Sequence, residues 1–389
     1  MKRLHFFFNS KLIIGYGGVE TWANYFLPLL CKVSDYEIHI YYINDQNDIN
    51  PKVYNQWENQ YNIKLHSIDI ENPHENFFLK NYLLYTLKIK AYLKDLDTLK
   101  IKEDYFIHIG SIMSGFCNKY LNLTNKYYKD SKKIVWVRSK SVGEISQGAS
   151  KAKQLIASML EKSIVKDSSV LITNGYDTEK YYKDKYIKVS PNVECIPNVI
   201  MNDFLHINIE KNIKDGKINV VFAGRLHITK GFHYFEEISK VNNDKLKFIA
   251  FGDDHNLDHK LKTISYEGKY NQKNLEDIFK LADVFLFLNL TSMAGGLSHS
   301  LLEAMSAGKI IVAWDNDIHS QVLNNKNAWL VPEGDTVSLM NVIKDISENH
   351  LKNENEIMNK RIRAREDSKK FTPINHINKF IRVIESTKS

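Results

Sequence analysis

Glycine-containing turns that follow apolar runs carry the residues of this chain that could do chemistry. The most informative turn lies at residues 295–308, where a glycine-rich loop precedes a short helical pattern and then a further apolar run. Ser298 is a good N-cap for that helix, and Gly308 suits the left-handed position that often ends one. The amides and the dipole at the start of such a helix favour an anion. The segment therefore predicts a phosphate-facing helix start between two strands.

The same segment offers a carboxylate at a useful distance from this helix start. The free backbone N–H groups are expected at residues 298–300, and Glu303 follows about a turn further on. Its carboxylate could accept hydrogen bonds from hydroxyl groups such as those of a ribose. Amides for a phosphate and an acceptor for a ribose together indicate a cradle for a nucleotide sugar.

Two further turns have related chemistry. Gly224 follows an apolar run and lets the backbone turn tightly, while Arg225 and Lys230 place two cations at the carboxyl end of that strand. A leaving diphosphate would need such neutralising charge. Near the N-terminus, Gly17 and Gly18 belong to a glycine turn ahead of a helix, where backbone amides could approach a diphosphate or an acceptor. The alternatives are a charged surface loop and a plain strand-to-helix turn.

Short apolar runs alternate with helical patterns along the whole chain, which indicates an α/β fold with parallel strands. The expected strands are residues 4–8, 38–43, 105–109, 134–137, 169–173, 220–223, 247–252, 284–288 and 310–314. Helical spacing is clearest at residues 18–32 and 151–166. We expect two doubly wound, Rossmann-like domains, in which ligands bind beyond the carboxyl ends of the strands. The turns described above lie at such strand ends.

A polar segment at residues 202–217 separates the two series of strands. We expect an N-terminal, acceptor-side domain at residues 1–200 and a C-terminal, nucleotide-sugar-binding domain at residues 201–365. The closing helix, at about residues 366–389, is expected to pack back on the first domain. The ligand site is expected in a central cleft that the two domains face.

Composition limits the class of protein. The chain has 389 residues, of which 43% are hydrophobic and 25% are charged, so two globular cores are within reach. Its cysteines, Cys31, Cys117 and Cys195, have no C-x-x-C spacing, which argues against a disulfide framework or a zinc site and favours a reducing cytoplasm. No apolar run approaches the roughly 20 residues that a membrane-spanning helix needs. No nucleic-acid-binding motif is found, so nucleic acid is not an expected partner.

The net charge is +7, and the basic excess is most visible at residues 80–133, where lysines alternate with tyrosine, leucine and isoleucine. Such a stretch could rest on an anionic membrane leaflet, and a solvated basic face is the alternative. We therefore expect a cytoplasmic protein, with peripheral contact to the cytoplasmic face of the inner membrane as a further expectation.

Taken together, the motifs resemble glycosyltransferase family 4, the retaining "group 1" glycosyltransferases with the GT-B fold. The segments that fall in the family's order are residues 221–226, 230–231, 267–268, 282–285 and 295–308. Residues 195–199 with Asp203 and Phe204 resemble the family's linker sequence, and residues 17–20 resemble its N-terminal loop. The similarity is dense over residues 195–335 and sparse before them.

The resemblance implies transfer of a sugar, with retention, from a nucleoside-diphosphate sugar, with a UDP-sugar as the leading donor. The acceptor would be a glycan, a lipid-linked molecule or a surface polymer in bacterial polysaccharide biosynthesis, such as lipopolysaccharide or capsule. Arg225 and Lys230 would hold the donor diphosphate as catalytic groups, and Glu303 would hold the ribose. The remaining donor contacts would come from Gly17, Gly18, Gly224, Gly296, Leu297, Ser298 and His299. No cofactor or metal is implied.

This chain departs from the family pattern at the donor sugar. The family usually has a glutamate eight positions before Glu303, and this chain has Gly295 there. Thr291 or Ser292, in the loop before it, could supply the missing polar contact. The donor sugar, the base, the acceptor and the linkage remain open.

Two residues of the N-terminal half are further candidates. The family often has a histidine after a strand of that domain, and His108 stands displaced from it by two positions. A catalytic role and a buried histidine are its two alternatives. Arg138 ends a strand and could meet an acidic acceptor or a phosphate on the acceptor side.

Two other functions are compatible with the same fold. One is a nucleotide-sugar epimerase, and the other is a non-catalytic subunit that binds nucleotide or a partner transferase. Retention of Arg225, Lys230 and Glu303 favours an active transferase. The Asp-x-Asp sequences at residues 95–97 and 315–317 match a metal-binding pattern of GT-A enzymes, but the doubly wound pattern argues against that fold. With no histidine ligand spacing either, no metal is predicted.

Overall fold

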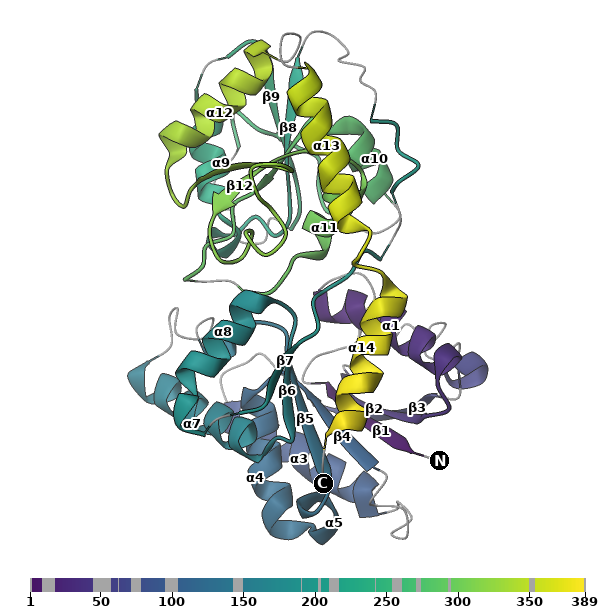
Figure 1. Cartoon of the computed structure of the whole chain (residues 1–389). Helices are drawn as coiled ribbons and strands as arrows, with labels where there is room; N and C mark the ends of the chain where they lie inside the picture. Colours follow the sequence, from purple (N-terminus) through teal and green to yellow (C-terminus); the bar gives the residue numbers. More distant parts are fainter. Residues whose placement is uncertain are drawn as a thin grey trace. The chain divides into compact units, whose positions relative to one another are not determined.

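The chain forms two compact units in a computed structural model (Figure 1). The first unit comprises Met1–Pro197 and Ile374–Ser389, and the second comprises Asn198–Pro373. The structure describes residues 2–8, 18–44, 57–61, 63–70, 78–94, 104–142, 150–189, 191–201, 204–209, 217–241, 243–253, 261–270, 274–292, 295–349 and 354–387. Each unit contains one parallel sheet covered by helices, which confirms the predicted α/β class.

The first unit has a seven-stranded sheet in the order β3-β2-β1-β4-β5-β6-β7. Its strands are β1 (Arg3–Phe8), β2 (Glu37–Asn44), β3 (Ile63–Asp69), β4 (Asp104–Ile109), β5 (Lys132–Val137), β6 (Val170–Thr173) and β7 (Val193–Cys195). Five of them were predicted. The other two, β3 and β7, lie at the edges of the sheet. Strand β3 mixes apolar with polar residues, and β7 is very short.

Two helical layers cover this sheet. Helices α1 (Gly18–Val33) and α14 (Pro373–Ser386) pack together over one face, around Phe6, Phe26 and Phe380. The other face carries α3 (Phe78–Lys94), α4 (Ile112–Thr124), α5 (Lys126–Lys129), α7 (Lys151–Asp167) and α8 (Tyr176–Lys185). The alternation of side chains along β4 and β5 supplies both cores, because successive residues point to opposite faces.

His376 ties α14 into the first unit. The indole Nε1 of Trp22 donates a hydrogen bond to His376 Nε2 at 3.1 Å, and His376 Nδ1 lies 2.9 Å from the carbonyl oxygen of Pro197. Since Nε2 accepts, Nδ1 carries the proton and donates to Pro197. The closing helix thus packs on the first unit, as the sequence indicated.

The second unit has a six-stranded parallel sheet in the order β10-β9-β8-β11-β12-β13. Its strands are β8 (Ile218–Ala223), β9 (Leu246–Phe251), β10 (Ser265–Tyr266), β11 (Val284–Phe287), β12 (Ile310–Asp315) and β13 (Trp329–Pro332). Its helices are α9 (Phe232–Ser239), α10 (Leu275–Leu281), α11 (His299–Ser306), α12 (Thr336–Asn349) and α13 (Glu354–Ser368). One core contains residues of α10 and α11, and the other contains residues of α9 and α12. The four central strands were predicted, and the edge strands β10 and β13 were not.

The units divide at slightly different residues from those expected. The first boundary lies between Pro197 and Asn198 rather than at residue 200, and the second lies after Pro373 rather than at residue 365. Helix α13 stays with the second unit because Arg361 Nε and Arg365 Nε donate to the carbonyls of Gly308 and Ser306, at 2.6 and 2.9 Å. Pro373 begins α14, at the first helical position, where its missing N–H costs no hydrogen bond.

Three histidines lie side by side on neighbouring strands of the first sheet. His5 faces His39 with ring centroids 4.7 Å apart, and His39 Nδ1 is 3.0 Å from His66 Nε2. Carboxylates contact two members of this row: Glu37 is 3.1 Å from His39 and Asp104 is 3.8 Å from His5. Burial is the largest influence on their pKa values, which fall to about 3 for His39 and about 4 for His66. The row is therefore neutral in the folded protein.

We predict that this row makes the first unit sensitive to acid. The unfolded chain binds these protons near pH 6.5 and the folded chain only near pH 3 to 4, so the stabilisation is complete above pH 6.5 and is lost as the pH falls. At pH 5 each such histidine would lower the free energy of unfolding by up to about 2 kcal/mol. The urea midpoint at pH 7 and pH 5 measures this loss. His66→Gln should reduce the difference between the two midpoints, and an unchanged difference would contradict the assignment.

Candidate functional site

Most of the predicted site residues belong to the second unit and lie along the edge of its sheet that is formed by the carboxyl ends of the strands. Because all its strands are parallel, the turns after β8, β9, β11 and β12 leave from the same edge. Arg225 follows β8, and the loop before α11 follows β11. Ligands in doubly wound folds bind at this edge.

Two glycines bring the turns after β8 and β9 into contact. The amide of Gly224 donates to Phe251 O at 3.0 Å, and the amide of Leu226 donates to Asp253 O at 3.1 Å. Gly252 has a φ of +154°, and a Cβ there would lie 1.7 Å from the carbonyl oxygen of Gly224. Only glycine fits such an approach. The turn is thereby fixed, and Arg225 at its tip is exposed.

Lys230 ends a short 3₁₀ turn, Ile228–Lys230, that the side chain of His227 caps. Gly231 follows with a φ of +73°, and a Cβ there would lie 2.1 Å from the carbonyl oxygen of Leu288, at the end of β11. The charge of Lys230 also reaches His319, beyond β12. Burial first, and Lys230 in addition, lower the pKa of His319 to about 4. Lys230 therefore lies near the ends of two further strands of the same edge.

The loop before α11 has the geometry that its sequence predicted, with one difference. Gly296 has a φ of +83° and Gly308 a φ of +62°, both in the left-handed region. Ser298 occupies the N-cap position, but its Oγ lies 2.8 Å from Ser300 Oγ and makes no capping hydrogen bond to the helix. The amides at the start of α11 are therefore not capped by this side chain.

Asn198 and Val199 brace this loop from another part of the chain. The buried Asn198 Nδ2 donates to Leu297 O at 2.5 Å, and His299 Nδ1 lies 2.8 Å from the carbonyl oxygen of Val199. The sequence analysis assigned this linker motif no role in the site. The motif Pro197-Asn198-Val199, which resembles the family's linker sequence, was the sequence signal that could have pointed to Asn198.

Glu303 lies inside the second unit, four residues beyond His299 and on the same side of α11. Its side chain is buried, with 1% of its surface exposed. Tyr270 lies near it: burial first, and the Glu303 carboxylate in addition, raise the pKa of the Tyr270 phenol to about 12. A buried carboxylate at this place is suited to accept hydrogen bonds from hydroxyl groups.

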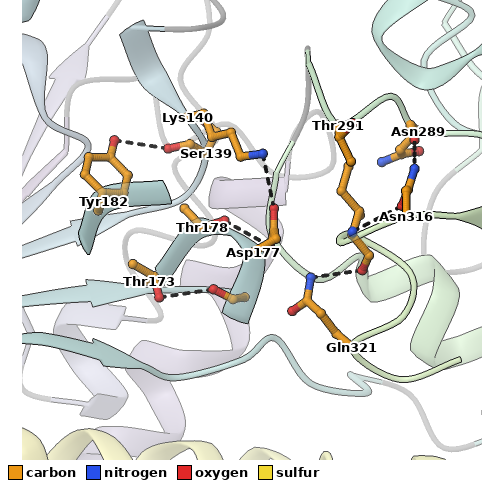
Figure 2. Close-up of polar contacts among 12 residues, drawn as sticks. Ser139, Lys140, Thr173, Asp177, Thr178, Tyr182, Asn289, Thr291, Asn316 and Gln321 are labelled. Carbon is orange, nitrogen blue, oxygen red and sulfur yellow. Dashed lines mark hydrogen bonds and ion pairs between the residues drawn. The ribbon is translucent and has the colours of Figure 1, made fainter. Parts of the chain in front are cut away.

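Thr291 makes its described contacts with a residue that the sequence analysis did not identify. Its amide and Oγ1 donate to the Glu333 carboxylate, with the shortest distance 3.0 Å. Asn316 Nδ2 lies 2.6 Å from the same carboxylate and 3.0 Å from the carbonyl of Asn289, a contact that Figure 2 shows. Glu333 thus holds the loop after β11 to the end of β12. Ser292, the other proposed substitute, is exposed.

His108 is a correction to the prediction of a catalytic histidine. It lies within β4, it is fully buried, and its Nε2 is 2.7 Å from Tyr128 Oη. Burial, and Lys133 in addition, lower its pKa to about 3. The side chain points from the strand into the core beneath α4 and α5, where Tyr128 is its hydrogen-bonding partner. The alternative of a buried histidine is the one that the structure shows.

Arg138 leaves the end of β5 in the first unit. Its guanidinium lies over the ring of Trp22, with 4.7 Å between Cζ and the ring centroid. Burial lowers its pKa to about 10, against the opposing influence of Tyr25 and Glu20. Two residues further along, Lys140 forms an ion pair with Asp177 at 3.7 Å (Figure 2).

The glycine turn at the N-terminus is described only in part. Gly18 begins α1, and a Cβ there would meet nothing within 4 Å. Gly17 lies outside the described residues, as do Asp95 and Asp97. Among the residues that the structure describes, no group of three or more His, Cys, Asp or Glu could hold a metal ion. Within the same residues, no helix is both long and apolar enough to cross a membrane.

Comparison with known proteins identifies this arrangement. Residues 217–349, from β8 to α12, match the family described as glycosyl transferases group 1. These residues form a glycosyltransferase domain. Over 333 residues the chain is 25% identical to an uncharacterised glycosyltransferase of Methanocaldococcus jannaschii, covering 78% of this chain and 80% of the relative.

A second relative and one solved structure add context. A 41.2 kDa uncharacterised protein in the cps region of Klebsiella pneumoniae is 25% identical over 204 residues, which cover 50% of this chain and 56% of that protein. The structure of HepE from Anabaena in complex with UDP resembles this chain with a TM-score of 0.68 and 14% identity, over 99% of this chain and 100% of that one. The two Rossmann-like sheets are those of the GT-B fold.

We predict that the Asn198 brace controls donor binding. Asn198→Ala would remove a buried donor from Leu297 O, and an unpaired buried carbonyl costs about 1 to 3 kcal/mol. The loop before α11 would loosen, and KM for the donor should rise about tenfold or more, with a smaller change in kcat. Steady-state kinetics measure both. Asn192→Ala, at an exposed asparagine, is the matched control, and equal effects of the two substitutions would contradict the prediction.

Proposed function

We propose that this glycosyltransferase moves a sugar, with retention, from a nucleoside-diphosphate sugar to a glycan, lipid-linked or surface-polymer acceptor. The proposal rests on one observation: the candidate residues all follow strands whose carboxyl ends lie along the same edge of the second sheet. Arg225, Lys230 and the start of α11 follow strands that end there, and Glu303 lies one turn inside α11. Cations, the backbone amides of a helix start and a carboxylate are the groups that a diphosphate and a ribose require.

Each group has a separate role in this proposal. Arg225 and Lys230 would neutralise the diphosphate as it leaves, which is where charge develops in the transition state. The amides of residues 297–299 would bind phosphate oxygens, and Glu303 would accept hydrogen bonds from the ribose. The acceptor hydroxyl would attack the oxocarbenium-like sugar on the face that the diphosphate leaves, so that the configuration is retained.

UDP is the leading candidate for the nucleotide, because HepE, which resembles this chain along its whole length, is known in complex with UDP. Surface polysaccharide biosynthesis is the proposed context, and the similarity to a protein of a cps region supports it. The proposed location is the cytoplasm and the cytoplasmic face of the membrane, in keeping with Cys31, Cys117 and Cys195, which are all free thiols.

Nucleoside diphosphate release from a panel of UDP-, GDP- and ADP-sugars tests the reaction. One donor should be hydrolysed slowly without acceptor, and Arg225→Ala with Lys230→Ala should lower that rate by about 10² to 10³, since each removes charge from the leaving group. Lys247→Ala with Arg363→Ala, at an exposed lysine and an exposed arginine of the same unit, is the matched control.

Other outcomes of this assay decide against the proposal. Nucleotide binding without release of any diphosphate, with acceptors also supplied, would indicate the non-catalytic subunit. Conversion of one nucleotide sugar into another would indicate the epimerase. An unchanged rate in the double variant would remove Arg225 and Lys230 from the reaction.

The role of Glu303 has its own test. Glu303→Gln keeps the shape of the side chain and removes its charge, and the hydrogen bonds of a charged acceptor are worth about 1.5 to 3 kcal/mol. We expect kcat/KM to fall about tenfold or more with the ribose-containing donor. The same substitution should have little effect on a donor whose 2′- and 3′-hydroxyls are absent. Equal losses with both donors would show that Glu303 acts on something other than the ribose.

A further inference from the structure

Helix α3 of the first unit is apolar on two opposite sides. Its inner side contributes Tyr82, Tyr85 and Ile89 to the core. Its outer side exposes a series of leucines, each with 39% to 42% of its surface accessible: Leu79, Leu83, Leu84 and Leu87. Exposed leucines that recur along one side of a helix form an apolar surface, and such surfaces mark contact sites more often than scattered apolar residues do. The outer side of α3 is therefore a candidate contact surface.

The other exposed positions of α3 are nearly all basic. Together the exposed residues form what we call the leucine–lysine face: Leu79, Lys80, Leu83, Leu84, Leu87, Lys88, Ala91 and Lys94. Leu79, Leu83 and Leu87 recur at intervals of four and so lie along one stripe, with Lys80 and Lys88 beside it. The sequence of α3 contains no aspartate or glutamate.

Helix α7 also carries exposed apolar and basic side chains on its outer side. Leu155 and Met159 are 63% and 55% exposed, and Lys151, Lys153 and Lys162 are exposed around them. Helix α4 packs against both α3 and α7, so all three belong to the layer on one face of the first sheet. Two helices of one layer thus combine exposed apolar side chains with lysines.

We propose that the leucine–lysine face docks on the surface of an anionic lipid bilayer, with α7 as a second contact. The leucines would enter the boundary between headgroups and acyl chains, and the lysine ammonium groups would meet lipid phosphates while their stems cover apolar surface. The inference deepens the proposed function by favouring a lipid-linked acceptor, and it rests on that function only for this last step. Donor hydrolysis without vesicles tests the transferase separately.

Charge selects the bilayer over a second copy of the chain. Two leucine–lysine faces brought together would place lysines against lysines, and α3 has no carboxylate to pair with them. An anionic lipid surface instead offers phosphates to Lys80, Lys88 and Lys94 and an apolar interior to the leucines. The face matches such a surface in both charge and hydrophobicity.

Sedimentation of the full chain with phosphatidylcholine vesicles, with and without phosphatidylglycerol, tests the docking. The native protein should bind the vesicles that contain phosphatidylglycerol, and salt should weaken this binding. Lys80→Gln with Lys88→Gln and Lys94→Gln should lower it about 100-fold, since each lysine near an anionic surface contributes about fivefold. Leu83→Ser with Leu87→Ser should lower it at least tenfold.

Control measurements separate docking from folding. Val337→Ser, at an exposed valine of the second unit, should leave vesicle binding unchanged. Every variant should retain donor hydrolysis in solution, because none of these residues lies in the proposed donor site. The lysine variant alters only solvated side chains, so it remains informative if the leucine variant fails to fold.

Three results would overturn the proposal. One is equal binding of the native chain to vesicles with and without phosphatidylglycerol, or binding to neither. Another is full vesicle binding by the lysine variant. The third is a concentration-dependent dimer of the native chain, formed without lipid and abolished by Leu83→Ser with Leu87→Ser, which would assign the face to self-association.

Discussion

The hydrogen bond from the Asn198 side chain to the carbonyl of Leu297 is the contact on which the geometry of the loop before α11 depends. The loop that it holds contains Gly295 and Gly296, and glycine gives a chain the most conformational freedom to lose on folding. Such a loop keeps one shape only when other segments hold it. Asn198 and Val199 do this from the residues that connect the two units, so the connection also shapes the site.

The opposite end of α11 is held by cations. Arg361 and Arg365 of α13 donate to the carbonyls of Gly308 and Ser306, where the helix dipole is negative. Burial lowers the pKa of Arg361 to about 10. Two carbonyls at the C-terminal end of this helix are therefore satisfied by arginines, while the Ser298 side chain makes no capping hydrogen bond at its start. That asymmetry suits a helix whose N-terminal end receives an anion.

Local sequence predicted the parts of the fold that follow from local physics. Apolar runs marked the central strands, where burial on both faces requires them, and Gly308 marked the end of α11 because its φ is positive. The edge strands β3, β7, β10 and β13 were missed, since pairing on one side allows short or mixed sequences. His108 belongs to a strand pattern that is compatible with both a site residue and a core residue. Only its contact with Tyr128 in the folded protein distinguishes these two alternatives. The contacts of Asn198 and Glu333 join segments far apart in the chain, and no local pattern contains them.

Helix α14 gives the chain a nested topology. Because Ile374–Ser389 complete the first unit, the second unit is inserted within the first rather than joined to its end. The second unit is continuous, so residues 198–373 could be excised as a single piece. The first unit is not: a fragment that stopped at Pro197 would leave Trp22 and Phe26 without His376 and Phe380. A stable first unit would need a short linker from Pro197 to Ile374 in place of the whole second unit.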